Sequence, residues 1–179
     1  MTPSKASKLP FAKAGQVLLS LRDIDTVAVL DLEKEEVVWT LRGPWHRQHD
    51  ADVLKNGDML LFDNYGHYGP GGFSQVVQFK PLPLKMNWHY AGDKEHFFQS
   101  GIRSGQERLP NGNTLIAESD GGRLSEVTRQ GELVWEYITP VRGGARNELI
   151  PVLSLGMARI APTSLDVDFL ETINQRNSP

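Results

Sequence analysis

Two stretches of this sequence match each other closely, and both contain an Asn-Gly pair. Residues 53–61 resemble residues 108–116, with the two Asn-Gly pairs 55 positions apart. Asn-Gly tolerates the positive backbone φ angles of a type I′ turn, and apolar residues flank each pair. Each stretch therefore predicts a β-hairpin. The repetition predicts that one small β unit occurs more than once in the chain.

A tryptophan recurs late in each repeat. Trp39, Trp88 and Trp135 follow one another at spacings of 49 and 47 residues. Radially arranged four-stranded blades would give such an interval, whereas a β-sandwich gives no reason to place a tryptophan periodically. We therefore predict an all-β protein containing about three blades of a β-propeller. An ordinary β-meander is the alternative.

The three predicted blades fill residues 14–140, with approximate bounds of 14–43, 49–92 and 101–140. A lead-in of residues 1–13 precedes them, and a segment of residues 141–179 follows. In that last segment Ser164 predicts the N-cap of a short helix. Its apolar face would contain four residues: Leu165, Phe169, Leu170 and Ile173. Propellers close with about four to eight blades, so three blades predict a part of a longer protein or a ring completed by self-association.

Composition excludes several functions. The net charge of -3 and the sequence pI of about 5.9 argue against a nucleic-acid partner, which usually meets a basic face. The absence of cysteine excludes disulfides, thiolate metal sites and a cysteine nucleophile. No apolar run approaches the roughly 18–20 residues of a membrane span, and residues 1–5 lack the apolar core of a signal peptide. We therefore expect no membrane partner.

Polar residues are predicted to converge where strand ends meet. His49 and Ser104 each lie seven positions before an Asn-Gly pair, at the start of an innermost strand. Antiparallel pairing returns the end of the second strand to the same mouth of the propeller, which adds Arg22, Asn64 and Ser119. A ligand site at this mouth is one interpretation. Inner-strand polar residues that merely hydrate a wide channel are the other.

A metal site was also considered around His46, His49 and Asp50. Successive side chains of a strand point to opposite faces, so His46 and His49 would meet only if the segment turns. Metal sites need three or more convergent ligands, and no second cluster supplies them. We therefore predict no metal and no cofactor, and we assign Asp50 an orienting or hydrogen-bonding role.

Several segments resemble the bacterial arylsulfate sulfotransferase family, in order, over residues 14–140. The resemblance is strongest in Gln48-His49-Asp50-Ala51-Asp52-Val53-Leu54 and Leu61-Phe62-Asp63-Asn64. It continues in residues 18–23, 74–79 and 104–116. Members of that family are six-bladed propellers, so the resemblance implies that this chain is the C-terminal half of such a propeller.

The resemblance also implies a reaction. Family members transfer a sulfuryl group from a phenolic sulfate ester to another phenol. His49 matches the histidine nucleophile that becomes transiently sulfated, and Arg22 matches the arginine that holds the sulfate oxygens. Asn64, Asp50 and Ser104 would then contact substrate or orient His49. The expected partners are small aryl sulfates and phenols.

The chain departs from the family pattern before the strand that ends at Arg22. A His-x-Asn pair is expected there, but Lys8-Leu9-Pro10-Phe11 stands in its place. A second family histidine, from an earlier blade, would also lie outside this chain. We therefore expect an incomplete fragment of weak activity, whose full-length parent is periplasmic or extracellular. The alternatives are a propeller that only binds ligands and a metal-dependent hydrolase.

Overall fold

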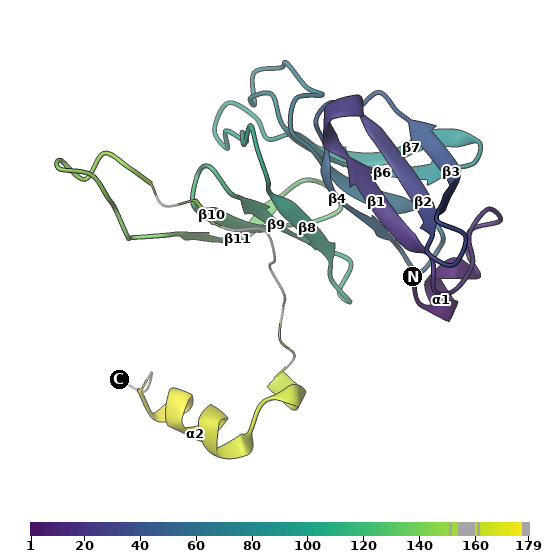
Figure 1. Cartoon of the computed structure of the whole chain (residues 1–179). Coiled ribbons are helices and arrows are strands. Elements are labelled where there is room, and N and C mark those ends of the chain that lie inside the picture. The colour runs from purple at the N-terminus through teal and green to yellow at the C-terminus, as the bar shows by residue number, and fades with distance from the viewer. Residues whose placement is uncertain (151, 154–159, 161, 177–179) are drawn as a thin grey trace.

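The computed structural model describes residues 1–150, 152–153, 160 and 162–176, and β-strands dominate it. The strands form three antiparallel sheets, which follow one another along the chain (Figure 1). The first sheet contains β1 (Val17–Leu21), β2 (Thr26–Asp31) and β3 (Glu36–Arg42). The second contains β4 (His49–Val53), β5 (Met59–Asp63), β6 (Gln75–Pro81) and β7 (Leu84–Tyr90). The third contains β8 (Gly105–Arg108), β9 (Thr114–Glu118), β10 (Arg123–Val127) and β11 (Leu133–Ile138).

The three sheets share one pattern, because each strand pairs with the next along the chain. The repeated tryptophans lie in the last strand of each sheet: β3, β7 and β11. By this alignment β1 corresponds to β5 and β9. The second and third sheets each have a further strand before it, β4 or β8. The first sheet has three strands in the described chain, without a counterpart of β4.

Both Asn-Gly pairs form hairpin turns, as predicted, but the predicted type I′ geometry is wrong. Gly57 and Gly112 have φ values of +88° and +91°, whereas neither asparagine has a positive φ. The N–H of Gly57 donates to the carbonyl of Leu54, and the N–H of Leu54 donates to the carbonyl of Asp58. This is a type I turn followed by a left-handed glycine, which adds one residue to the loop.

The second sheet is covered on both faces. Side chains alternate along β5, so Met59 and Leu61 pack toward the first sheet, while Leu60 and Phe62 pack toward the third. All five residues of β5 are buried. The last strand of each sheet is mostly exposed: β3, β7 and β11. The core therefore consists of two layers, one on either face of the second sheet.

Each of the first two recurring tryptophans is covered by a different part of the chain. Phe11 stacks on Trp39 with ring centroids 3.9 Å apart. The guanidiniums of Arg108 and Arg129 lie over the Trp88 ring. Trp135, in the last strand, remains 46% exposed. The neighbours of this repeated position therefore differ from sheet to sheet.

The N-terminal lead-in belongs to the core rather than preceding it. It begins with a short helix, α1 (Pro3–Ala6), capped by the hydroxyl of Thr2. Leu9 is 3% exposed and packs in the layer between the first and second sheets. The Lys5 ammonium pairs with the carboxylate of Asp52 in β4. These contacts attach the lead-in to the end of the sheets that carries the Asn-Gly turns.

The predicted C-terminal helix is present as α2 (Val167–Arg176), after a short turn, η2 (Pro162–Ser164). Its predicted cap is wrong. The carboxylate of Asp166 accepts hydrogen bonds from the N–H groups of Asp168 and Phe169, at 2.9 and 3.3 Å, so Asp166 takes the capping position. None of the helices in the described part of the chain has the length and apolar character needed to cross a membrane.

Candidate functional site

His49 and Asn64 meet where β4 begins and β5 ends. His49 is the first residue of β4, and antiparallel pairing sets it opposite Phe62. Asn64 directly follows β5. Its Oδ1 lies 2.7 Å from Nδ1 of His49. The structure thus brings together two of the residues that the sequence placed at this mouth.

The amide of Asn64 has a fixed orientation. The side chain is fully buried, and its Nδ2 donates to the carbonyls of Ser100 and Arg103 at 2.7 and 3.1 Å. Only the NH₂ end of an amide can donate to two carbonyls. Oδ1 must therefore face His49, where it can only accept.

This contact selects one tautomer of the imidazole. Because Asn64 Oδ1 accepts, Nδ1 of His49 carries the proton. The other ring nitrogen, Nε2, then holds an unshared electron pair in neutral histidine. A neutral imidazole held in this way is a nucleophile with a defined reactive atom.

Arg22 lies at the same end of the neighbouring sheet. It follows β1 and opens the short turn η1 (Arg22–Ile24). The hydroxyl of Ser20 donates to the carbonyl of Gln48 at 3.1 Å, so the end of β1 adjoins the residue before His49. Arg22 pairs with the exposed Asp23, whereas its Nε is buried without a hydrogen-bond partner. Nη1 of Arg22 thus pairs with a surface carboxylate, whereas Nε has no hydrogen-bond partner among the described residues.

Asp50 links the second sheet to the third. Its Oδ2 accepts a hydrogen bond from the N–H of Gln106 at 2.9 Å, and its carbonyl accepts one from Gln106 Nε2 at 2.7 Å. Desolvation raises the pKa of the Asp50 carboxyl, although the Gln106 hydrogen bond partly offsets this. The contacts fix the position of β4 relative to β8, directly beside His49.

Ser104 binds Ser119, which the sequence also placed at this mouth. Both side chains are fully buried. The N–H of each serine donates to the hydroxyl oxygen of the other, at 2.9 and 3.1 Å. The pair therefore joins the start of β8 to the end of β9. A substrate could reach these hydroxyls only after the pair opens.

Two carboxylates that the sequence reasoning missed support the loop before His49. Asp25 accepts hydrogen bonds from the N–H of Arg47 at 2.8 Å and lies 3.2 Å from Nδ1 of His46. Asp63, fully buried, accepts from the N–H of His46 at 2.8 Å. Burial raises the pKa of Asp63, and the hydrogen bonds only partly offset it. An aspartate at the end of a predicted apolar strand, as Asp63 is at the end of β5, could have signalled this role.

Backbone strain gathers at the same end of the sheets. Positive φ values are rare for residues other than glycine, and strained positions cluster at functional sites. Seven such residues occur in the described chain, and five of them flank the His49 end: Asp25, Arg47, Asp50, Arg103 and Ser104. A pattern of apolar and polar residues does not encode these angles. The positive φ values therefore indicate a functional site at this end of the sheets, independently of the side-chain contacts.

The residues considered for a metal site have other partners. His46 contacts Asp25, His49 contacts Asn64 and Asp50 contacts Gln106. Across the described residues, no group of three or more His, Cys, Asp or Glu side chains is arranged to hold a metal ion.

The sequence matches that of a known protein family. The sequence model of a family described as Arylsulfotransferase (ASST) matches residues 3–140. That range contains all three sheets and every residue of the candidate site. A search of curated proteins finds no match.

Solved structures resemble parts of this chain at low sequence identity. A streptogramin B lyase structure is 18% identical, with a TM-score of 0.50 over 72% of this chain and 39% of its own. Virginiamycin B lyase from Staphylococcus aureus is 14% identical, with a TM-score of 0.46 over 70% of this chain and 38% of its own. This chain thus spans about two fifths of the length of these structures. The three antiparallel sheets and the streptogramin B lyase likeness confirm the predicted all-β, propeller-type fold.

Proposed function

The chain belongs to the arylsulfotransferase family, and on that premise we propose that it transfers a sulfuryl group between phenols with His49 as the nucleophile. The hydrogen bond between His49 Nδ1 and Asn64 Oδ1 carries this proposal. It leaves Nε2 with the electron pair that an attack on sulfur requires.

The reaction has two displacement steps. In the first, Nε2 of His49 forms a bond to sulfur while the bond from sulfur to the phenolic oxygen breaks, and the phenolate leaves with that electron pair. In the second, the oxygen of the acceptor phenol attacks sulfur, and Nε2 recovers its electron pair. The proton lost by the acceptor balances the one taken up by the first phenolate. Sulfation makes the imidazole ring cationic, and the Asn64 carbonyl stabilises the Nδ1 proton in that state.

Arg22 is the proposed binder of the sulfate oxygens. A guanidinium offers a planar fork of donors that fits the equatorial oxygens of a sulfuryl group in transfer. Its Nε is buried and lacks a hydrogen-bond partner, which leaves a donor available for an anion. Binding would also replace the ion pair with Asp23, which costs little because Asp23 is 83% exposed.

We propose weak turnover for this chain alone and retain a ligand-binding propeller as the second candidate. One observation favours the ligand-binding propeller. Leu9 and Phe11, which stand where the resemblance expects a His-x-Asn pair, pack in the core and on Trp39. The groups that would protonate the leaving phenolate must then come from elsewhere.

The exposed last strand, β11, offers a surface for self-association. For the full-length parent we propose a periplasmic or extracellular location.

Turnover of a chromogenic aryl sulfate tests the proposal. The wild-type chain, mixed with 4-nitrophenyl sulfate and an acceptor phenol, should release 4-nitrophenol, and His49→Ala should abolish the release. His89→Ala is the matched control, because His89 is an exposed histidine on β7. Equal release by wild type and His49→Ala would exclude His49 as the nucleophile. Saturable binding without release would favour the ligand-binding propeller.

A further inference from the structure

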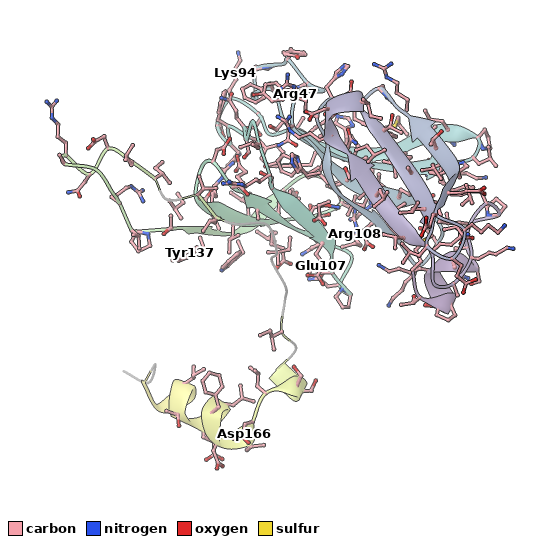
Figure 2. All side chains as sticks on the ribbon, in the orientation of Figure 1. Arg47, Lys94, Glu107, Arg108, Tyr137 and Asp166 are labelled. Atoms are coloured by element: carbon pink, nitrogen blue, oxygen red, sulfur yellow. The ribbon has the colours of Figure 1, made fainter. Side chains whose placement is uncertain are left out.

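A cavity lies at the opposite end of the sheets from His49, beside the Asn-Gly turns. It has a volume of about 620 Å³ and lies between the second and third sheets. Pockets of about 300–1,000 Å³ are typical of small-molecule sites. Four basic side chains line it, against two carboxylates: Lys5, Lys55, Arg108 and Arg129, with Asp52 and Glu107. Figure 2 labels Arg108 and Glu107 on the lower part of the sheets and Arg47 near their upper end.

Two of these cations share one aromatic ring. The guanidinium carbon of Arg108 lies 4.7 Å from the centroid of Trp88, and that of Arg129 lies 5.2 Å from it. The indole N–H of Trp88 donates to the carbonyl of Arg129 at 2.8 Å, which holds the second arginine in place. The two positive charges are therefore fixed close together by β7, β8 and the turn between β10 and β11.

The hydrogen-bond acceptor that the two guanidiniums share is neutral. Both donate to Oε1 of Gln78 in β6. Nε2 of Gln78 in turn donates to the carboxylate of Asp58 at 2.6 Å, which fixes the amide with its oxygen toward the arginines. An amide oxygen satisfies one donor of each guanidinium but does not neutralise its charge.

The surroundings of Arg108 disfavour its positive charge. Burial, together with the neighbouring positive charge of Arg129, lowers the pKa of its guanidinium to about 10. Among the described residues, its buried Nε has no hydrogen-bond partner. Closely spaced cations with unused donors are the usual way in which proteins bind carboxylate, phosphate and sulfate groups.

We propose that this cavity binds an organic oxyanion, whose charged group lies between Arg108 and Arg129. The apolar part of the ligand would contact Val53, Leu54 and Leu109, which also line the cavity. Such a site goes beyond the proposed sulfuryl transfer, because it lies at the other end of β4 and uses none of the residues around His49.

Isothermal titration calorimetry of the full chain with phenyl phosphate, at constant ionic strength, tests the proposal. The wild type should show saturable binding. Arg129→Gln should weaken it by at least about tenfold, because a charge-assisted contact is lost. Arg129 is exposed, so this variant should still fold. Arg108→Lys should also weaken binding, because an ammonium lacks the planar fork.

Arg146→Gln is the matched control, since it removes one exposed arginine charge outside the cavity. Inorganic phosphate should bind more weakly than phenyl phosphate, because it lacks the apolar ring. Arg22→Gln separates this site from the proposed aryl sulfate site beside His49, and saturable binding of phenyl phosphate should persist in it. The proposal is wrong if Arg129→Gln and Arg108→Lys bind phenyl phosphate as tightly as Arg146→Gln. It is also wrong if only Arg22→Gln abolishes binding, a result that would leave the proposed function intact.

Discussion

The carboxylate of Asp50 and the backbone N–H of Gln106 form a 2.9 Å hydrogen bond across the boundary between the second and third sheets. It depends on the glycine beside it. A Cβ atom at Gly105 would lie 2.6 Å from Oδ2 of Asp50, closer than such atoms come in proteins. The residue after His49 is thus positioned by the neighbouring sheet, and only glycine leaves room for the contact.

Gly105→Ala should therefore destabilise the protein. The added methyl group must displace the Asp50 carboxylate or separate β4 from β8, and overpacking of this kind costs about 1–3 kcal/mol. Chemical denaturation of the wild type and the variant measures the change. Gly121→Ala is the control, because its Cβ would meet nothing closer than 3.8 Å. Equal losses in the two variants would show that the Asp50 contact is not the cause.

Asn64→Ala should remove the preference of His49 for the Nδ1–H tautomer. Without Oδ1 as acceptor, the imidazole is free to carry its proton on either nitrogen. The ¹⁵N chemical shifts of the ring should change from an Nδ1–H pattern to a mixture. The variant should also lose about 1–3 kcal/mol of stability, because the hydrogen bonds that Asn64 Nδ2 donates to the carbonyls of Ser100 and Arg103 are lost.

Ser74→Ala separates the two effects of Asn64. The Ser74 hydroxyl donates to the backbone carbonyl of Asn64 and does not contact His49. That variant should lose stability while keeping the Nδ1–H pattern. An unchanged ring spectrum in Asn64→Ala would mean that Asn64 does not position His49.

Arg22→Lys should strongly lower the rate of turnover, although it preserves the positive charge. An ammonium cannot reproduce the two-point contact of a guanidinium with sulfate oxygens. Loss of one such donor should lower the rate of aryl sulfate turnover by a factor on the order of 10²–10³. Arg42→Lys changes an arginine that contacts Asp25 only at 3.8 Å, and it should retain the wild-type rate. A wild-type rate in Arg22→Lys would remove Arg22 from the site.

Asp63→Asn should change how stability depends on pH. Burial raises the pKa of Asp63 above its ordinary value of 3.8, so the folded state takes up this proton more readily than the unfolded state. As pH falls from neutral toward 3.8, the wild type should therefore gain stability relative to Asp63→Asn. Thermal melts at several pH values measure this difference.

Asp31→Asn provides a comparison of opposite sign. The hydrogen bond from Gln16 lowers the pKa of Asp31, so its ionised form favours the folded state. The wild type should lose stability relative to this variant as pH falls through the lowered pKa. The same sign in both comparisons would contradict the assignment for Asp63.

The sequence predicted the sheets because local patterns encode them. The Asn-Gly turns and the recurring tryptophans fixed the hairpins and the last strand of each sheet, and the predicted blade bounds enclose all eleven strands. The turn geometry was wrong because a type I turn followed by a left-handed glycine also accepts asparagine directly before that glycine. The helix cap was wrong because Ser164 and Asp166 are both good caps, and sequence alone does not rank them.

At the site, strand alignment placed His49 and Asn64 at one mouth, and their hydrogen bond agrees with that placement. The roles of Asp50 and Ser104 depend on partners elsewhere in the chain: Gln106 in β8 and Ser119 directly after β9. Those contacts come from the packing of one sheet on another and the closure of a hairpin, which local periodicity does not describe. The left-handed angles at Arg47 and Asp50 likewise come from tertiary contacts.

The most direct test of the account is the location of the sulfuryl group after one turnover. The wild-type chain, incubated with 4-nitrophenyl sulfate without an acceptor, would be digested at neutral pH and its peptides sequenced by mass spectrometry. The account predicts one acid-labile sulfuryl group, on the peptide containing His49 and on that residue. A sulfuryl group on any other residue, or release of phenol from a chain that never becomes labelled, would contradict it.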